Sequence, residues 1–468
     1  MPTGFPSHAR SQDLTRKQEA DVVVLGMGPG GEDVAGRLAQ AGLDVVGVER
    51  ELVGGECPYW GCVPSKMMLR AAHLLAEARR VRGMAGDSVV RPDWAPVAKR
   101  IREEATDTWD DQVAVDRFEG KGGRFLRGEG RVVAPDVVAV GGHHVHAPRG
   151  MVLATGTSPA IPPVPGLDRV PYWTNREAVA VEELPTSLVV LGGGAVGVEL
   201  AQVFARFGVD VTLVEALDRL MPAEEPEVGP VLAEVLASEG VDVRLGVKVT
   251  EVHRDRARVA VSLEDGTAVA AAQLLVATGR RADLATLGVG SLGVDESQRW
   301  LPVDDHLRVS DGVWGVGDLT GKGAFTHVAL YQAPIAVADI LGQDGPPAEY
   351  RAVPHVTFTD PEIGAVGLSE EAARAAGITV QVGTARVPET ARGWIHKSGN
   401  EGLIKLVADA ARGVLVGATA MGPSGGEVIG LLSLAVHAEV PVEHLRRMIY
   451  TYPTFHRGVE DALRDLDV

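Results

Sequence analysis

The sequence predicts an α/β protein in which one strand–glycine turn–helix–strand unit occurs twice, followed by a separate α+β domain. Three observations support this prediction. GMGPGG at residues 26–31 directly follows the β-branched run Val22–Leu25, and GGGAVG at residues 192–197 directly follows SLVVL. From Arg351 onward, strand-like and helix-like segments alternate without such glycine runs. The chain of 468 residues is long enough for about three domains.

The first glycine run matches a dinucleotide-binding fingerprint. Gly26, Gly28 and Gly31 have the spacing G-x-G-x-x-G, and the helix-like run EDVAGRLAQAG follows them. A second strand, DVVGVER, contains Glu49, which lies 23 residues after Gly26. The first glycines allow a tight turn and the close approach of a pyrophosphate, the third allows the helix to pack on the strand, and the acid binds a ribose hydroxyl. With all these parts present, the segment is predicted to be a Rossmann-like nucleotide unit.

The second glycine run repeats the same plan. Gly192, Gly194 and Gly197 are followed by a helix-like run and by VDVTLVE, so that Glu215 again lies 23 residues after the first glycine. Two units predict two separate dinucleotides, as a redox enzyme needs when one cofactor passes electrons to the other. The charge of Glu215 would repel a 2′-phosphate, which predicts NAD rather than NADP. Arg219, four residues further on, leaves NADP as the less favoured alternative.

Both cysteines of the chain lie in one short stretch, GGECPYWGCVPSK. Cys57 and Cys62 are separated by four residues, and Pro64 and Lys66 follow. The apolar, alanine-rich run after them, with a proline near its start, predicts that a helix begins at this point. A thiol at a helix N-terminus ionises more readily because of the helix dipole. The stretch therefore predicts a redox-active dithiol.

Composition and charge narrow the function and the location. A net charge of −18 argues against nucleic acid and anionic membranes as partners. Two close cysteines in a chain otherwise without cysteine indicate a reducing compartment. The first twenty residues are polar and lack a signal-peptide core, and no apolar run is long enough for a membrane span. We therefore expect a cytoplasmic protein with a loose N-terminal arm.

The segments between these motifs are expected to complete the domains. Residues 66–120 look mostly helical, with an amphipathic outer helix over 96–118, and short strands are expected within 123–148. The tripeptide Ala-Thr-Gly ends a strand at residues 154–156 and again at 277–279, which marks two domain crossings. Asp318 follows a strand and Gly317, where the local sequence alone fits a turn residue as well as a ligand. The Tyr452–Thr454 segment is expected to open a final helix.

With these residues in view, the chain resembles the class I pyridine nucleotide-disulfide oxidoreductases, the family of dihydrolipoamide dehydrogenase, glutathione reductase and mercuric reductase. The match extends from about residue 20 to the C-terminus. The resemblance implies a homodimer with an active site shared across subunits and a small-molecule substrate. The implied parts are an arm (1–19), an FAD domain (20–165), an NAD(P) domain (166–276), a central domain (277–348) and a dimerisation domain (349–468).

The resemblance also implies roles for individual residues. Cys57 would be the thiol that attacks substrate, Cys62 the thiol against the flavin, and Lys66 would lie near flavin N5 and pair with Glu199. Hydride from NADH would reduce the flavin, and electrons would then pass to the Cys57–Cys62 disulfide. Besides Lys66, the implied FAD-binding residues are Gly26, Gly28, Gly31, Glu49, Gly55, Gly130, Gly156, Asp318, Ala324, Phe325, Thr326 and His327. The implied NAD-binding residues are Gly192, Gly194, Gly197, Glu215, Val249 and Gly279.

The C-terminal segment departs from the family pattern. Disulfide reductases of the family carry His-Pro-x-x-x-Glu, whereas this chain has Tyr452 at the His position and Arg457 at the Glu position. A tyrosine donates a hydrogen bond at neutral pH but is a poor base. His456 is a candidate substitute, although its expected phase on the final helix differs from that of residue 452.

Two further departures lie beside the dithiol. Glu56 replaces the usual Thr, which places an unexpected charge near a pyrophosphate, and the bulky residues 58–60 lie between the cysteines. A mercuric reductase is disfavoured because its extra C-terminal cysteine pair is absent.

These observations lead to one main hypothesis and two alternatives. The main hypothesis is an FAD-dependent, NADH-preferring oxidoreductase that passes electrons through Cys57 and Cys62 to a small disulfide, dithiol or related acceptor. In the first alternative, a quinone or another acceptor is reduced at the level of the flavin and the dithiol is not essential. In the second alternative, the protein is a subunit of a lipoyl-bearing multienzyme complex. Together, the departures beside the dithiol, at Glu56 and at residues 58–60, and those in the C-terminal segment indicate that ordinary lipoamide or glutathione turnover is poor, or that the substrate differs.

Overall fold

A computed structural model describes residues 18–466, and the chain forms two compact units. The first unit comprises residues up to Tyr59 together with 106–158 and 280–348, and the second comprises 60–105, 159–279 and the remainder. Most of the expected N-terminal arm lies outside the described residues. Its last two residues, Gln18–Glu19, form strand β1, which pairs with β7 (His143–His146).

The first unit is built on a six-stranded sheet with the order β18-β19-β8-β2-β3-β4. Its strands are β2 (Val22–Leu25), β3 (Val45–Glu49), β4 (Arg124–Arg127), β8 (Gly150–Leu153), β18 (Arg308–Ser310) and β19 (Val313–Gly315). All neighbours are parallel except β18 and β19. The first predicted unit, β2 followed by helix α1 (Pro29–Gln40) and β3, is confirmed.

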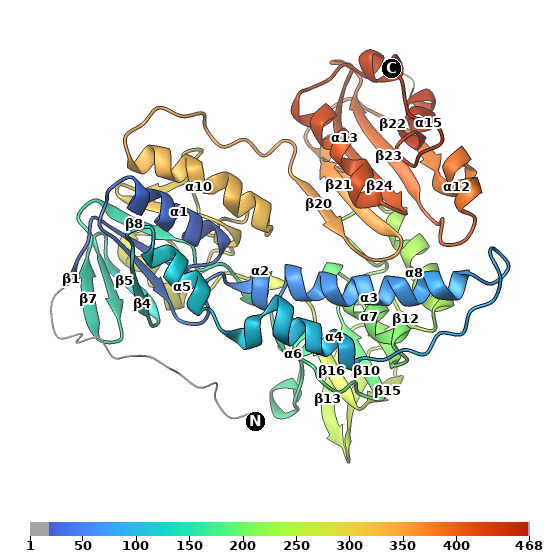
Figure 1. Cartoon of the computed structure of the whole chain (residues 1–468), viewed down its shortest axis with the longest axis horizontal. Helices are drawn as coiled ribbons and strands as arrows, with labels where there is room; N and C mark the ends of the chain where they lie inside the picture. The colour runs from blue at the N-terminus through green and yellow to red at the C-terminus, as the bar shows by residue number, and fades with distance from the viewer. Residues whose placement is uncertain (1–17, 467–468) are drawn as a thin grey trace. The chain divides into compact units, whose positions relative to one another are not determined.

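Side chains on the two faces of this sheet pack into different cores. On β2, Val22 and Val24 join a core with α1, α5 (Gln112–Glu119) and α10 (Thr326–Ile340), whereas Val23 and Leu25 face a second core. Alternation along a strand sends successive side chains to opposite faces. Figure 1 shows α10 lying alongside α1. The apolar run of β2 is thus explained by burial on both sides.

The second core lies against the four-stranded sheet β1-β7-β6-β5. Strands β5 (Gly130–Ala134), β6 (Val137–Val140) and β7 pair antiparallel, which confirms the short strands expected within 123–148. A short helix α9 (Leu284–Leu287) and a 3-10 turn (Val289–Leu292) pack on this core. The first unit therefore has three layers, with helices, the parallel sheet and the small sheet in that order.

The second unit contains the repeated nucleotide motif. Parallel strands β12 (Asp242–Arg244), β11 (Asp210–Val214), β10 (Ser187–Leu191) and β16 (Gln273–Val276) form one sheet in this order. Helix α7 (Ala195–Arg206) connects β10 to β11, as predicted, and α8 (Val228–Ser238) precedes β12. A three-stranded antiparallel sheet of β13 (Val249–Asp255), β14 (Arg258–Leu263) and β15 (Ala268–Ala271) shares a core with it.

The segment expected to be mostly helical, residues 66–120, is more broken than predicted. Helix α3 (Cys62–Arg80) is long and begins where the dithiol motif predicts. Residues 81–94 then lack a helix, and α4 (Ala95–Arg100) runs into a π-helical turn (Ile101–Ala105) and a 3-10 turn (Asp107–Trp109) before α5. In the 3-10 turn Thr108 has a φ of 56°, which interrupts the expected single amphipathic helix.

The C-terminal part of the second unit is an α+β domain, as expected. Antiparallel strands follow the order β20-β21-β24-β23-β22, with bounds Pro354–Thr357, Glu362–Gly367, Val414–Gly422, Leu403–Asp409 and Val380–Arg386. Helices α13 (Gly425–His437), α14 (Val442–Arg446) and α15 (Gly458–Asp465) pack on this sheet through one apolar core. Shorter helices are α2 (Glu56–Tyr59) in the first unit and α6 (Asn175–Val179), α11 (Glu370–Ala375) and α12 (Ala391–His396) in the second.

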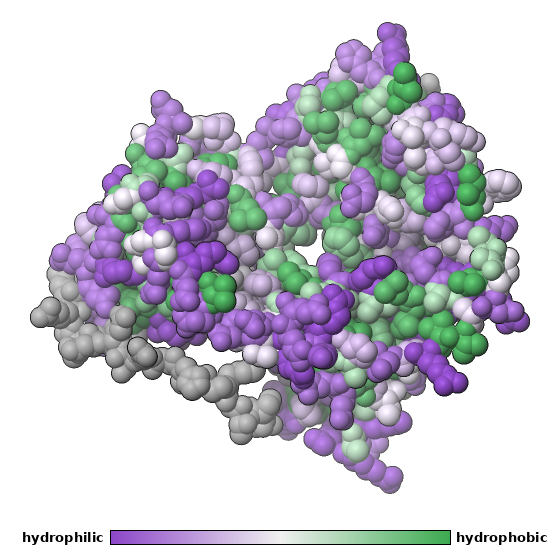
Figure 2. Space-filling view, in the orientation of Figure 1, coloured by the Kyte–Doolittle hydropathy of each residue, from purple (hydrophilic) through white to green (hydrophobic). Residues whose placement is uncertain are grey.

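The surface in view is largely polar. Figure 2 shows hydrophilic residues over most of that face, with hydrophobic residues in scattered groups. This agrees with a net charge of −18 and with 23% charged residues. Among residues 18–466, the helices are too short or too polar to cross a membrane.

Candidate active site

The first and third glycines of each fingerprint are required by close packing. Gly26 has a φ of 87°, and a Cβ there would overlap the Ala154 carbonyl oxygen, while a Cβ on Gly31 would overlap the Gly26 carbonyl oxygen. In the second unit Gly192 and Gly197 have the same contacts, with Ala277 in the place of Ala154. Both alanines belong to the Ala-Thr-Gly tripeptides. These two glycines thus seat each helix on its strand and on the crossing segment.

The middle glycine of each fingerprint has a different role. Gly28 is the N-cap of α1 and Gly194 the N-cap of α7, and a Cβ on either would meet no atom within 4 Å. Packing does not demand glycine at these positions, whereas a ligand approaching the helix N-terminus does. Each turn leaves open the space into which a side chain would project, so the residues present fit a dinucleotide pyrophosphate in both units.

The two acids at the strand ends have matching hydrogen bonds. Glu49 accepts from the Met27 N–H at 2.9 Å and the Glu51 N–H at 2.8 Å. Glu215 accepts from the Gly193 N–H at 2.6 Å and the Leu217 N–H at 2.8 Å. Burial raises the pKa of Glu49, and its two backbone hydrogen bonds oppose the rise. Each carboxylate is therefore held against the glycine turn, where it retains lone pairs for a ribose hydroxyl.

The two cysteines lie on consecutive helices. Cys57 is half-buried and lies in α2. This helix ends at Tyr59, the last residue of the first unit before the chain enters the second unit. Cys62 is exposed and is the first residue of α3 in the second unit. The dipole of the 19-residue helix α3 favours a negatively charged sulfur at Cys62.

Lys66, in the first turns of α3, forms the expected ion pair with Glu199 of α7. Its Nζ lies 2.8 Å and 3.1 Å from the two Glu199 carboxylate oxygens, and Glu199 is 5% exposed. Glu199 also accepts the Phe358 N–H at 2.8 Å, and Nζ lies 4.8 Å from the centre of the Phe358 ring. The Lys66 ammonium is thereby held in one place, because it is the cationic partner of a carboxylate that is itself nearly fully buried.

Asp318 belongs to a group of polar residues that the sequence does not reveal. It begins a 3-10 turn after β19, and its carboxylate lies 3.4 Å from the Thr157 hydroxyl. Arg280 donates to that hydroxyl at 2.8 Å and to the Thr157 carbonyl at 2.7 Å, and its guanidinium lies 3.5 Å from the Glu56 carboxylate. Burial raises the pKa of Asp318, Arg280 opposes the rise, and Glu56 adds to it. The unexpected charge of Glu56 therefore has a cationic partner.

The other residues implied for the flavin side lie on several elements of the first unit. Gly55 has a φ of 64°, and a Cβ there would lie 2.9 Å from the Cα of Gly28. Gly130 begins β5, and a Cβ there would meet Leu25 and Val48 at 3.2 Å. Gly156 has a φ of 65°. The segment Ala324–His327 leads into α10, with the Phe325 and His327 rings stacked at 5.2 Å.

Two residues implied for the nicotinamide side differ in their surroundings. Gly279 has a φ of 118° and open space at its Cβ position, as Gly156 has in the first unit. Val249 begins β13 and is partly buried against the core between the two sheets of this domain. Packing in this core is enough to explain a valine at position 249, and no ligand contact is needed to explain it.

The bulky residues between the cysteines are held by packing and stacking. Tyr59 is 7% exposed, and burial, with Asp111 adding to it, raises the pKa of its hydroxyl to about 12. The Trp60 carbonyl accepts from Asn175 at 2.7 Å, and the Arg176 guanidinium lies 5.5 Å from the Trp60 ring centre. Tyr59 is thus a core residue, whereas Pro58 and Trp60 are both partly exposed.

The C-terminal segment differs from the prediction. Helix α15 begins at Gly458, so Tyr452 does not open it, and the expected helical phase of His456 does not apply because both residues precede the helix. Proline at 453 and the turns that follow explain the delay. Tyr452 is 66% exposed, and the Arg457 guanidinium lies 5.3 Å from its ring centre.

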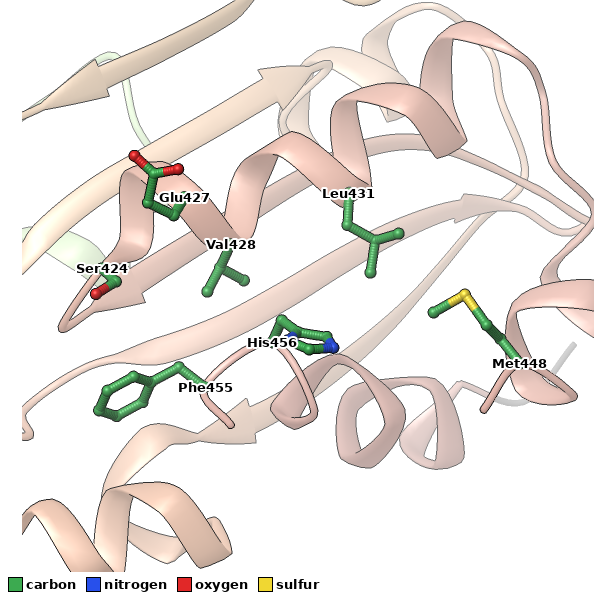
Figure 3. Close-up of a pocket in the computed structure, with 7 residues that line it drawn as sticks. All are labelled: Ser424, Glu427, Val428, Leu431, Met448, Phe455 and His456. Atoms are coloured by element: carbon green, nitrogen blue, oxygen red, sulfur yellow. The ribbon is translucent and has the colours of Figure 1, made fainter. Parts of the chain in front are cut away.

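The His456 ring lines a cavity of about 440 Å³ rather than lying at the exposed end of this segment. Figure 3 shows the ring beside Val428 and Leu431 of α13, with the Glu427 carboxylate directed away from it. The cavity is mainly apolar, with Met448 and Phe455 also in its wall. This setting favours a packing role for His456 over the role of a substitute base.

Two residues of the site escaped prediction. Arg280 follows the second Ala-Thr-Gly directly, and Thr157 follows the first. A repeated tripeptide with a polar residue after each copy is the one signal that could have indicated them. Their contact joins segments 123 residues apart, which pattern reading along the chain does not detect.

The fold and the site define a class of enzyme: a flavoprotein with two dinucleotide units and a dithiol between a phosphate-binding turn and a long helix. The chain belongs to the pyridine nucleotide-disulphide oxidoreductases, whose family model matches residues 20–333. The dimerisation-domain model of the same family matches residues 353–463. The predicted family is thereby confirmed, and with it an FAD-dependent pyridine nucleotide-disulfide oxidoreductase that forms a homodimer.

Relatives of known name cover nearly the whole chain. Dihydrolipoyl dehydrogenase of Chlorobaculum tepidum is 34% identical over 96% of this chain and 98% of its own. Mercuric reductase of Staphylococcus aureus is 30% identical over 98% of this chain and 84% of its own. The structure of the HOCl-induced flavoprotein disulfide reductase RclA from Escherichia coli, solved as a Cu(II) complex, superposes with a TM-score of 0.83. It is 26% identical over 96% of this chain and 99% of that one.

Proposed function

We propose that the protein is an NADH-preferring enzyme that reduces a small disulfide, or a related acceptor, through Cys57 and Cys62. The observation that carries this proposal is the start of α3, where Cys62 and Lys66 stand four residues apart and Lys66 is fixed by Glu199. FAD, when bound, would take a hydride from the nicotinamide and deliver electrons to the cysteine pair. The fixed cation supports this role because it can stabilise the negative charge of a reduced cofactor.

The cysteines would then act in sequence on a disulfide substrate. The Cys57 thiolate attacks one substrate sulfur, which breaks the substrate disulfide and releases one thiolate. The Cys62 thiolate next attacks the mixed disulfide at Cys57, which forms the Cys57–Cys62 disulfide and releases the second thiolate. The resemblance implies this division of labour, and the half-buried Cys57 remains partly accessible to a substrate.

A preference for NADH over NADPH follows from the second nucleotide unit. Glu215 is 8% exposed, and both of its oxygens are anchored to the glycine turn. Its charge opposes the 2′-phosphate of NADPH at the position where it would accept the ribose hydroxyl of NADH. Arg219 donates to the Pro222 carbonyl at 3.2 Å, which favours its serving the local turn rather than a phosphate.

Cys57→Ser tests the role of the dithiol. We expect this variant to lower NADH-dependent reduction of the small disulfide that the native enzyme reduces fastest on the order of a thousandfold or more, because the attacking thiolate is lost. Flavin content and the rate of flavin reduction by NADH should stay unchanged, and they serve as internal controls. Native turnover of every disulfide tested would contradict the proposal.

A second candidate is reduction of a quinone-like acceptor at the flavin. The observation that favours it is Tyr452, a highly exposed residue with Arg457 over its ring where the disulfide reductases of the family carry a base. A leaving thiolate needs a proton, whereas direct reduction at the flavin does not depend on a base beside the dithiol. Unchanged quinone turnover in Cys57→Ser would support this candidate, and a parallel loss would exclude it.

Tyr452→His is expected to raise lipoamide reduction by about tenfold or more, because a positioned acid–base group contributes about 10²–10⁴ in rate. The gain should appear at neutral pH and follow the titration of an imidazole. Tyr452→Phe is the matched control, since it removes the hydroxyl without adding a base. If both variants behave alike, the acid–base position is not what limits disulfide turnover.

A further inference from the structure

Glu56 puts a negative charge beside the first phosphate-binding turn. Its neighbour Gly55 packs so closely on that turn that a Cβ there would lie 2.9 Å from the Cα of Gly28. The Glu56 side chain retains 29% exposure, so bulk water only partly screens its charge. A carboxylate at this point would oppose the two negative charges of a pyrophosphate held at the N-terminus of α1.

Arg280 is positioned to offset that charge. Its guanidinium lies 3.5 Å from the Glu56 carboxylate, and it donates to the hydroxyl and the carbonyl of Thr157 at 2.8 Å and 2.7 Å. Two hydrogen bonds to one residue fix the plane of the guanidinium, which a lysine could not reproduce. The same Thr157 hydroxyl approaches Asp318, so the arginine faces both carboxylates of this part of the unit.

We propose that Arg280 is a positioning residue that retains FAD by neutralising Glu56. Without the guanidinium, the Glu56 carboxylate would lose the cation that lies 3.5 Å from it. Thr157 holds the guanidinium in place through two hydrogen bonds. The role arises from the carboxylate at position 56, where the family usually has threonine. The inference rests on FAD binding by the first unit.

A double-mutant cycle on FAD affinity tests the proposal. Apoprotein is titrated with FAD, and the quenching of flavin fluorescence gives the dissociation constant for the native chain, Arg280→Met, Glu56→Thr and the double variant. We expect Arg280→Met to weaken FAD binding about tenfold, because Arg280 then no longer offsets the repulsion between the Glu56 carboxylate and the phosphates. Glu56→Thr should bind as tightly as the native chain or more tightly. The double variant should match Glu56→Thr within about threefold.

Two controls separate this role from a structural one. Arg281→Met removes the neighbouring exposed arginine of the same short strand and should leave FAD affinity unchanged. Raising the salt concentration should narrow the gap between Arg280→Met and the native chain, because salt screens the repulsion. Circular dichroism of each apoprotein checks that it is folded.

Three results would overturn the inference: native affinity in Arg280→Met, a double variant as weak as Arg280→Met alone, or Glu56→Thr binding tenfold more weakly than the native chain. The second would mean that Arg280 acts on the cofactor directly and not through Glu56. If the native chain itself takes up no FAD, the proposed function fails instead, and the two failures are thereby distinguishable.

Discussion

Gly28→Val is expected to produce a folded protein that purifies without FAD. The φ of Gly28 is −66°, with extended ψ, which valine adopts without strain, and no atom lies within 4 Å of the Cβ position. The added side chain would instead fill the space at the N-terminus of α1 that a pyrophosphate needs. We expect FAD affinity to fall by about a hundredfold or more, since each tenfold corresponds to about 1.4 kcal/mol. The ratio of flavin to protein absorbance after purification measures how much FAD the variant retains.

Gly31→Ala is the matched control for this prediction. A Cβ on Gly31 would overlap the Gly26 carbonyl oxygen, so even a methyl group disturbs the packing of α1 on β2. The Gly31→Ala apoprotein should have a lower melting temperature than the native apoprotein. The Gly28→Val apoprotein should have the same melting temperature as the native apoprotein. Stoichiometric flavin in purified Gly28→Val would show that the first glycine turn does not hold the cofactor.

Gly194→Val is expected to retain FAD and to lose reduction by NADH. Gly194 occupies in the second unit the place of Gly28 in the first, with a φ of −80° and open space at its Cβ position. The substitution should raise the KM for NADH by about a hundredfold or more, because the helix N-terminus can no longer approach the pyrophosphate. Stopped-flow measurement of flavin reduction at increasing NADH concentration gives the NADH concentration at which the reduction rate is half-maximal, for the variant and for the native enzyme.

Chemical reduction controls for damage to the flavin site in this variant. Dithionite should reduce the flavin of Gly194→Val as completely as that of the native enzyme, because it does not need the nicotinamide site. The two glycine variants also serve as controls for each other, since each blocks one of two equivalent positions. Native reduction of Gly194→Val by NADH would contradict the assignment of the second unit.

Local sequence patterns were sufficient to predict the repeated units. Each unit carries its strand, turn and helix signals within about thirty residues. The glycines at 26, 31, 192 and 197 are required by contacts inside their own unit. The start of α3 at Cys62 was predicted for the same reason, because a proline at the third position and an apolar run define it locally. Short-range physics therefore accounts for much of the fold and for the phosphate-binding turns.

Features that depend on long-range contacts were not predictable in this way. The pairing of Arg280 with Thr157 and Glu56 joins three distant segments, and the burial of Tyr59 depends on a core that the pattern around the cysteines does not show. The Tyr452–Thr454 segment was expected to open the final helix, whereas α15 begins at Gly458 and Tyr452 lies in the loop before it. The acceptor is undetermined by the family, since its relatives include both dihydrolipoyl dehydrogenases and mercuric reductases.

The central claim is that electrons from NADH reach the cysteine pair. Anaerobic titration of the native enzyme with a stoichiometric amount of NADH tests it most directly. Our account predicts a long-wavelength absorbance band from a thiolate beside the oxidised flavin, and it predicts that Cys62→Ser removes this band while the flavin itself is still reduced. Persistence of the band in Cys62→Ser, or bleaching of the native flavin without any such band, would contradict the account.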